Sequence, residues 1–147
     1  MNRSQVFRRV GAVSATGVAL ILGAAPVANA TWSSYIENWG IGSKSRTWSD
    51  ESYTQTHFTK CSTSYSSSSV DVRLYRYRQN DEPIAYDIKH FTQCMYWSDG
   101  DDTSTGVWTG LPAGSYYFQI KGIDGFGSGS EPRLAVREVI QDTTLAD

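Results

Sequence analysis

The residue types that could do acid–base chemistry are few in this sequence and are not grouped. The only histidines, His57 and His90, each stand in a stretch of alternating side chains typical of a β-strand. A general base needs a nucleophile within hydrogen-bond reach, and no spacing here brings one to either histidine. The run GSGSE at 127–131 lacks the spacing of a nucleophile elbow, and GIGSKS at 40–45 lacks the Gly-Lys pair of a phosphate-binding loop. The sequence therefore predicts no catalytic residue.

Three carboxylates close together are the only candidates for a metal site. Asp99, Asp101 and Asp102 offer oxygen atoms, which are the ligands that calcium prefers. The calcium loop of a helix–loop–helix motif would need glycine where Ser104 stands and an acid where Gly110 stands. We expect a solvated loop and no cofactor, with irregularly bound calcium as the alternative.

The chain contains two cysteines, Cys61 and Cys94. Two cysteines in an oxidising compartment most simply form one disulfide, which here closes a loop of about 34 residues. Such a loop stabilises the fold by about 3–4 kcal/mol in the chain-entropy model. The alternatives are a free nucleophile and half of a metal site, which neither a CxxC motif nor a histidine at ligand spacing supports.

The first 30 residues have the three-part layout of a secretory signal. Three arginines and no acid come first, a run rich in Gly and Ala follows, and ANA at 28–30 places small residues at the cleavage positions. We predict cleavage after this motif and a secreted, extracellular domain over 31–147. A membrane anchor is the alternative. The Arg8-Arg9 pair leaves open whether export uses the general or the twin-arginine route.

The predicted mature chain is mildly acidic. It has 117 residues, with ten Lys and Arg against fifteen Asp and Glu. Nucleic acids and anionic membranes both need clustered positive charge, so we expect neither as a partner after signal cleavage. We expect a monomer with one domain, since this length suffices for one buried core.

Short runs rich in Tyr, Val, Thr, Ile and Trp alternate with Gly, Ser, Asp and Asn throughout the mature chain, without helical periodicity. The sequence predicts an all-β fold, a single antiparallel β-sandwich of Greek-key or jelly-roll type. Residues 32–44 fit an edge strand or irregular structure, and we expect the tail after 140 to fray. The expected strands, about seven, are 46–48, 53–60, 70–78, 84–91, 107–109, 115–121 and 133–140.

The stretch LPAGSYYFQI at 111–120 joins a turn to a strand. Leu111, Gly114 and Tyr117 have the spacing L-x-x-G-x-x-Y, which resembles the tyrosine corner of Greek-key sandwiches. In that corner a tyrosine hydroxyl bonds back to the loop backbone, which satisfies a polar group beside the core. The alternative is that Tyr116 or Tyr117 is an ordinary packed strand residue.

A wider resemblance rests on three segments: DVRLYRY at 71–77, GLPAGSYYFQI at 110–120, and LAV at 134–136 with a following Val139. Together they resemble the bacterial pre-peptidase C-terminal domains, small extracellular β-sandwiches, and also small secreted proteins of actinobacteria. The similarity covers the second two-thirds of the mature chain. The cysteine pair and the Trp-rich N-terminal third depart from the pattern. The resemblance implies an accessory or binding role and no catalytic residues.

The mature chain carries 18 aromatic residues, more than we expect a core of this size to hold. Trp48 and Trp108 lie in predicted strands and are expected in the core. Trp97, Trp39 and Trp32 are the candidates for exposed ligand-binding rings.

These observations predict a non-catalytic extracellular binding module. Its partner would be an extracellular polysaccharide, such as the cell wall, or a secreted protein. The alternatives are a secreted protease inhibitor, with a loop near Asp99 braced by the disulfide, and a small hydrolase.

Overall fold

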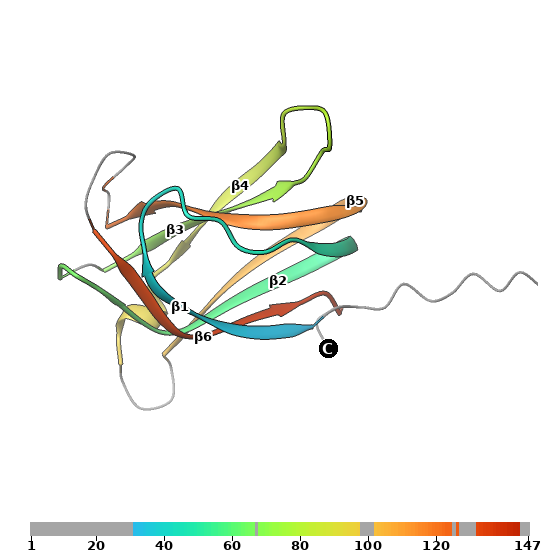
Figure 1. Cartoon of the computed structure of the whole chain (residues 1–147). Coiled ribbons are helices and arrows are strands. Elements are labelled where there is room, and N and C mark those ends of the chain that lie inside the picture. The colour runs from blue at the N-terminus through green and yellow to red at the C-terminus, as the bar shows by residue number, and fades with distance from the viewer. Residues whose placement is uncertain (1–30, 67, 98–101, 125, 127–131, 145–147) are drawn as a thin grey trace, which may run out of the picture.

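Six β-strands and one short 3-10 helix make up the described part of the chain, which comprises residues 31–66, 68–97, 102–124, 126 and 132–144 of a computed structural model (Figure 1). The expected all-β, antiparallel fold is confirmed. The predicted signal segment, 1–30, lies outside the described residues. No helix in the described ranges is long and apolar enough to cross a membrane. The elements are β1 (Trp32–Trp39), β2 (Trp48–Thr63), β3 (Val70–Arg76), β4 (Ile84–Phe91), η1 (Gln93–Met95), β5 (Thr103–Ile123) and β6 (Leu134–Asp142).

The strands form where apolar and polar side chains alternate. In β3, Val70, Val72 and Leu74 are fully buried, while Asp71 and Arg73 between them are partly exposed. This period of two places one face of the strand against the core and the other toward solvent.

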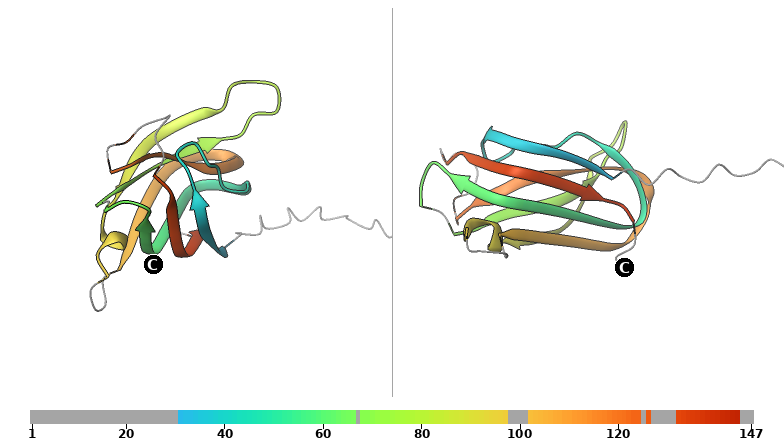
Figure 2. Two further views of the ribbon diagram at one scale, coloured as in Figure 1. Left: turned by 60° about the vertical axis from the view of Figure 1, so that its left-hand side comes forward. Right: turned by 90° about the horizontal axis from the view of Figure 1, so that it is seen from below.

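All six strands belong to one continuous antiparallel sheet, in the order β1-β6-β2-β5-β3-β4. Phe58 in β2 and Phe91 in β4 are three strands apart in this order, or about 14 Å in a flat sheet. Their ring centroids nevertheless lie 4.9 Å apart. The sheet is therefore folded over, so that its two ends form two facing layers, with β1 and β4 far apart in the strand order (Figures 1 and 2).

The long strands β2 and β5 take part in both layers. The pairing of β2 with β5 shifts register around Ser52, which has a positive φ of 69°. Gly110 in β5 has a φ of 66°, a value that glycine adopts without steric cost. The N-terminal end of β2 still pairs with residues 114–116 of β5, and from Tyr116 to Ile123 β5 pairs with β3. The expected sandwich thus arises from one bent sheet, because bulges and left-handed residues re-aim the two strands.

Aromatic rings fill the space between the layers. Phe58 packs edge-on against Phe91 and also against Phe118, at 5.5 Å between centroids. Gly106 lies under Phe91, where a Cβ atom would come within 2.7 Å of the ring. The missing side chain lets the ring approach the backbone of β5.

The observed strands differ from the predicted ones in three ways. There are six rather than about seven: segments 46–48 and 53–60 merge in β2, 107–109 and 115–121 merge in β5, and β1 adds one strand that was not among the seven. Within residues 32–44, which the sequence left open between an edge strand and irregular structure, Trp32–Trp39 forms the edge strand β1. The strand β6 continues to Asp142 and Gln141 is fully buried, so fraying does not begin after 140.

Candidate functional site

The five tryptophans divide into two kinds. Trp48 and Trp108 are buried, as expected, and the Trp108 indole donates a hydrogen bond to the Asp87 carbonyl at 3.1 Å. Trp97 is 60% exposed, and Trp32 and Trp39 are partly buried against the core. The three candidate binding rings therefore do not share one surface.

Trp97 borders a groove on the outer face of the β1-β6-β2 layer. The groove has a volume of about 500 Å³. Tyr35, 67% exposed, stands on β1, and the small side chains of Ala135 and Ser62 lie among the lining residues. The groove forms because the small side chains of Ala135 and Ser62 leave space between the large rings of Tyr35 and Trp97. The lining residues are Tyr35, Ile36, Glu37, Lys60, Ser62, Trp97, Ala135, Val136 and Arg137.

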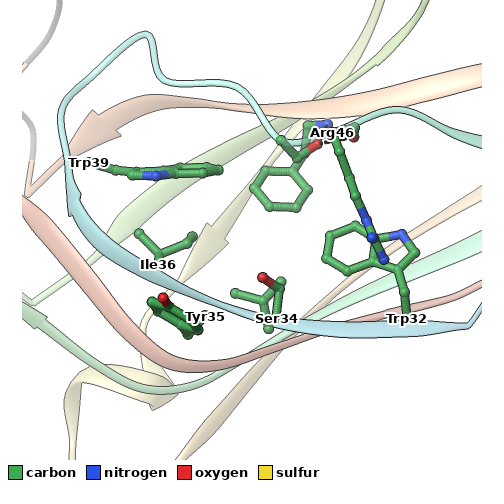
Figure 3. Close-up of a pocket in the computed structure, with 9 residues that line it drawn as sticks. Trp32, Ser34, Tyr35, Ile36, Trp39 and Arg46 are labelled. Carbon is green, nitrogen blue, oxygen red and sulfur yellow. Dashed lines mark hydrogen bonds between the residues drawn. The ribbon is translucent and has the colours of Figure 1, made fainter.

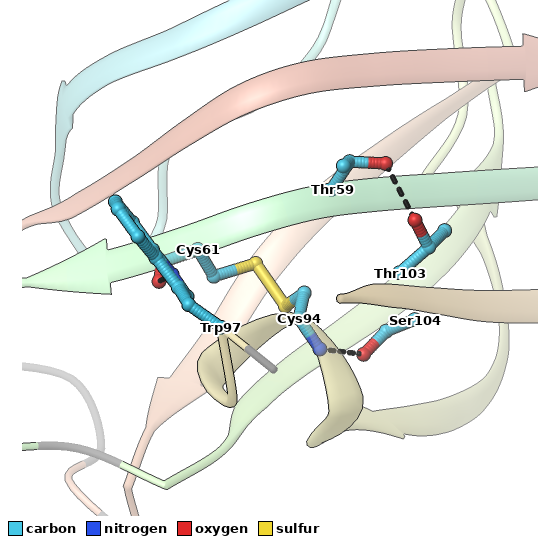
Figure 4. Close-up of a disulfide and its surroundings, with 6 residues drawn as sticks. All are labelled: Thr59, Cys61, Cys94, Trp97, Thr103 and Ser104. Carbon is cyan, nitrogen blue, oxygen red and sulfur yellow. Dashed lines mark hydrogen bonds between the residues drawn. A yellow bond between two sulfur atoms is a disulfide. The ribbon is translucent and has the colours of Figure 1, made fainter. Parts of the chain in front are cut away.

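The disulfide positions Trp97. Cys61 in β2 and Cys94 in η1 are bonded, as predicted, with their Cα atoms 5.0 Å apart (Figure 4). Trp97 follows Cys94 by three residues, and its indole N–H donates a hydrogen bond to the Cys61 carbonyl at 2.9 Å. The Cys94 N–H in turn donates to the Ser104 hydroxyl. An exposed ring held in this way presents its face with little rotational freedom to lose on binding.

Three charged side chains, Lys60, Arg137 and Glu37, line the groove together with the Tyr35 and Trp97 rings. Lys60 has a φ of 54° and its Nζ lies 3.4 Å from an Asp102 carboxylate oxygen. Arg137 and Glu37 make no ion pair with any residue in the described ranges. The groove thus combines two apolar faces with free hydrogen-bond donors and acceptors.

Trp32 and Trp39 line a second, smaller pocket, of about 140 Å³, between β1 and the segment that leads to β2 (Figure 3). Trp32 packs against buried Trp48 at 6.0 Å, and Trp39 packs against Phe118 at 6.2 Å. Arg46 lies over the Trp32 ring at 4.1 Å. These rings are mainly packing residues, with one side turned to the pocket.

The tyrosine corner forms, but through a different residue from the predicted one. The Tyr116 hydroxyl donates a hydrogen bond to the Pro112 carbonyl, and burial raises the pKa of this phenol. Tyr117 instead stacks on Tyr75, with ring centroids 5.3 Å apart. Leu111 is buried next to Pro112. Tyr116, rather than its neighbour, therefore reaches back along the continuous strand β5 to the Pro112 carbonyl.

The residues considered for chemistry lie apart from one another. His57 Nδ1 is 2.9 Å from the Thr105 hydroxyl, and burial lowers its pKa. His90 Nδ1 is 2.6 Å from Asp71 on the neighbouring strand β3. Asp99 and Asp101 lie outside the described residues, and with them the loop considered for a protease inhibitor. Asp102 is paired with Lys60, and no three metal-ligating side chains converge in the described ranges.

No protein-family model matches the chain, and no curated protein matches it significantly. The resemblance to pre-peptidase C-terminal domains stays a prediction.

Sequence reasoning missed the partners of Trp97. Tyr35, Lys60 and Arg137 come from three strands and meet only in the folded sheet. The alternation of Tyr35 and Glu37 around buried Ile36 was the one signal that could have placed Tyr35 on an outer face.

Proposed function

We propose that this protein is an exported, non-catalytic binding domain that holds a polysaccharide chain in the groove bordered by Tyr35 and Trp97. The observation that carries the proposal is the exposed Trp97 ring, held by its hydrogen bond to Cys61 beside the disulfide. A sugar ring has an apolar C–H face that packs on an aromatic face, and hydroxyl groups around its edge. A rigid ring with charged and polar side chains nearby suits both features.

Two further observations support the proposal. The disulfide fits an oxidising compartment, which agrees with the signal-like sequence at 1–30. Glycoside hydrolysis generally uses a pair of carboxyl groups flanking the scissile bond. Among the described residues lining the groove, Glu37 is the one carboxylate.

Depletion by insoluble glycans tests the proposal. The purified protein is incubated with polysaccharides and cell-wall preparations of known composition, and the protein left in the supernatant is measured. We expect at least one glycan to deplete the wild-type protein, and Trp97→Ala to bind about tenfold or more weakly. Trp97→Phe should retain part of the binding because it keeps an aromatic face.

Tyr77→Ala is the matched control. Tyr77 is another exposed aromatic residue and does not line the groove. Its loss should leave binding unchanged. Failure of every glycan to deplete the protein, or equal binding by Trp97→Ala, would refute the proposal.

A further inference from the structure

The strand β1 has one edge without a strand partner in the described part of the chain. It pairs with β6 on one side and ends the strand order on the other. The segment that follows β1 bonds elsewhere, because the N–H groups of Gly42 and Ser45 donate to the carbonyls of Ile120 and Phe118 in β5. A free edge of this kind can pair with an added strand.

The smaller pocket lies directly beside this edge (Figure 3). Its apolar lining comes from Trp32, Ile36, Trp39, Phe118 and Val139. Its volume of about 140 Å³ is close to that of the apolar cavity, about 150 Å³, that binds benzene in an engineered protein. The pocket therefore fits one apolar side chain. A strand added beside β1 would direct every second side chain toward the pocket side.

The charge beside the pocket favours an acidic occupant. Arg46 lines it, with its guanidinium over the Trp32 ring. Arg46 makes no ion pair with a carboxylate of the described residues. The β1 strand of a second copy would offer no acid here, since its inward side chains at this pocket are Trp32, Ser34 and Ile36.

We propose that the free edge of β1 and the pocket beside it form a docking site for an extended segment of a partner protein. That segment pairs with the β1 backbone, inserts one apolar side chain into the pocket, and carries an acidic side chain on the same face that pairs with Arg46. The site is separate from the glycan groove, although Tyr35 and Ile36 line both.

Blocked seven-residue peptides test this proposal. The probe is Thr-Asp-Thr-Leu-Thr-Asp-Thr, in which Asp, Leu and Asp share one face of a strand, so that one Asp can meet Arg46 whichever way the peptide runs. We expect titration to shift the backbone amide NMR signals of 32–39. Replacing Leu by Ser should weaken binding by about tenfold, and replacing both Asp by Lys should abolish it. Methylation of the peptide nitrogens that face β1 should also prevent binding, because it removes the donors of the added strand.

Two neighbouring serines provide matched protein variants. Ser34 lines the pocket, so Ser34→Phe should fill it and abolish peptide binding. Ser33 lines neither the pocket nor the groove, so Ser33→Phe should bind like the wild type. Glycan depletion by Ser34→Phe should be unchanged, which separates this site from the proposed function.

Three results would overturn the proposal: no shift in 32–39 at millimolar peptide, equal binding by Ser34→Phe, or shifts that map to the Trp97 groove. A concentration-dependent dimer that protects the amides of β1 would also overturn it, because a second copy would then cover the edge.

Discussion

The two ends of strand β2 are held in different ways. Near its C-terminal end, the Cys61–Cys94 disulfide connects the strand to η1, and Trp97 beside it stays exposed. Near its N-terminal end, β2 faces the bend of β5, where Tyr116 and Asp50 are buried. The first end is held by a covalent bond as well as by the hydrogen bond from the Cys94 N–H to the Ser104 hydroxyl, and the Trp97 ring remains exposed there. The second end depends on burial and hydrogen bonds and leaves little ring surface exposed.

Of the changes considered, removal of the disulfide should have the largest effect on the free energy of unfolding. We expect Cys61→Ala with Cys94→Ala to lower the free energy of unfolding by about 3–4 kcal/mol, since the unfolded chain loses the constraint of a 33-residue separation. Urea denaturation followed by circular dichroism measures this. If the loss were below about 1 kcal/mol, the disulfide end would not depend on its covalent bond.

The hydrogen bond of the tyrosine corner should contribute less to the free energy of unfolding than the disulfide does. Tyr116→Phe leaves the ring in place and removes the hydroxyl that bonds to the Pro112 carbonyl. We expect a loss of about 1–1.5 kcal/mol in the free energy of unfolding. Tyr117→Phe is the control, because the Tyr117 ring stacks on Tyr75 and would be retained. Equal losses for the two variants would show that the hydrogen bond from Tyr116 to the Pro112 carbonyl contributes no particular stability.

Asp50 should make the stability of the N-terminal end of β2, beside the tyrosine corner, sensitive to pH. Burial raises the pKa of its carboxyl above the ordinary value of 3.8, although the nearby Thr54 hydroxyl and the Glu51 N–H act in the opposite direction. The stabilising contribution of the protonated carboxyl is complete below pH 3.8 and is lost as the pH rises through the raised, folded-state value.

We therefore expect Asp50→Asn to unfold at a higher temperature than the wild type at pH 7, with the difference disappearing near pH 3. Thermal melts at several pH values measure this. A variant less stable than the wild type at pH 7 would show that the ionised carboxylate stabilises the corner.

Trp97→Ala should have the smallest effect on stability, within about 0.5 kcal/mol, because most of the ring is exposed. Denaturation of this variant, measured beside its glycan binding, separates the ring's proposed role from a structural one. A loss above 1 kcal/mol would mean that Trp97 helps to hold the disulfide end.

Much of the fold followed from local patterns, while the site did not. The alternation around Val70, Val72 and Leu74 predicted the core face of β3, and two cysteines predicted the disulfide. The groove could not be predicted, because Tyr35 and Trp97 are distant in the sequence and meet only through the pairing of β1, β6 and β2.

By itself the sequence determined the strand-forming segments, the buried face of several strands and the identity of the cysteine pair. These depend on a period of two residues and on which groups can bond covalently, both of which are visible in the chain. Only the tertiary structure decided that one sheet bends into two layers, that Tyr116 rather than Tyr117 makes the corner, and that Trp97 is exposed while Trp32 and Trp39 pack against the core. The physical reason is that exposure depends on what covers a residue, and here the covering strands come from distant parts of the chain.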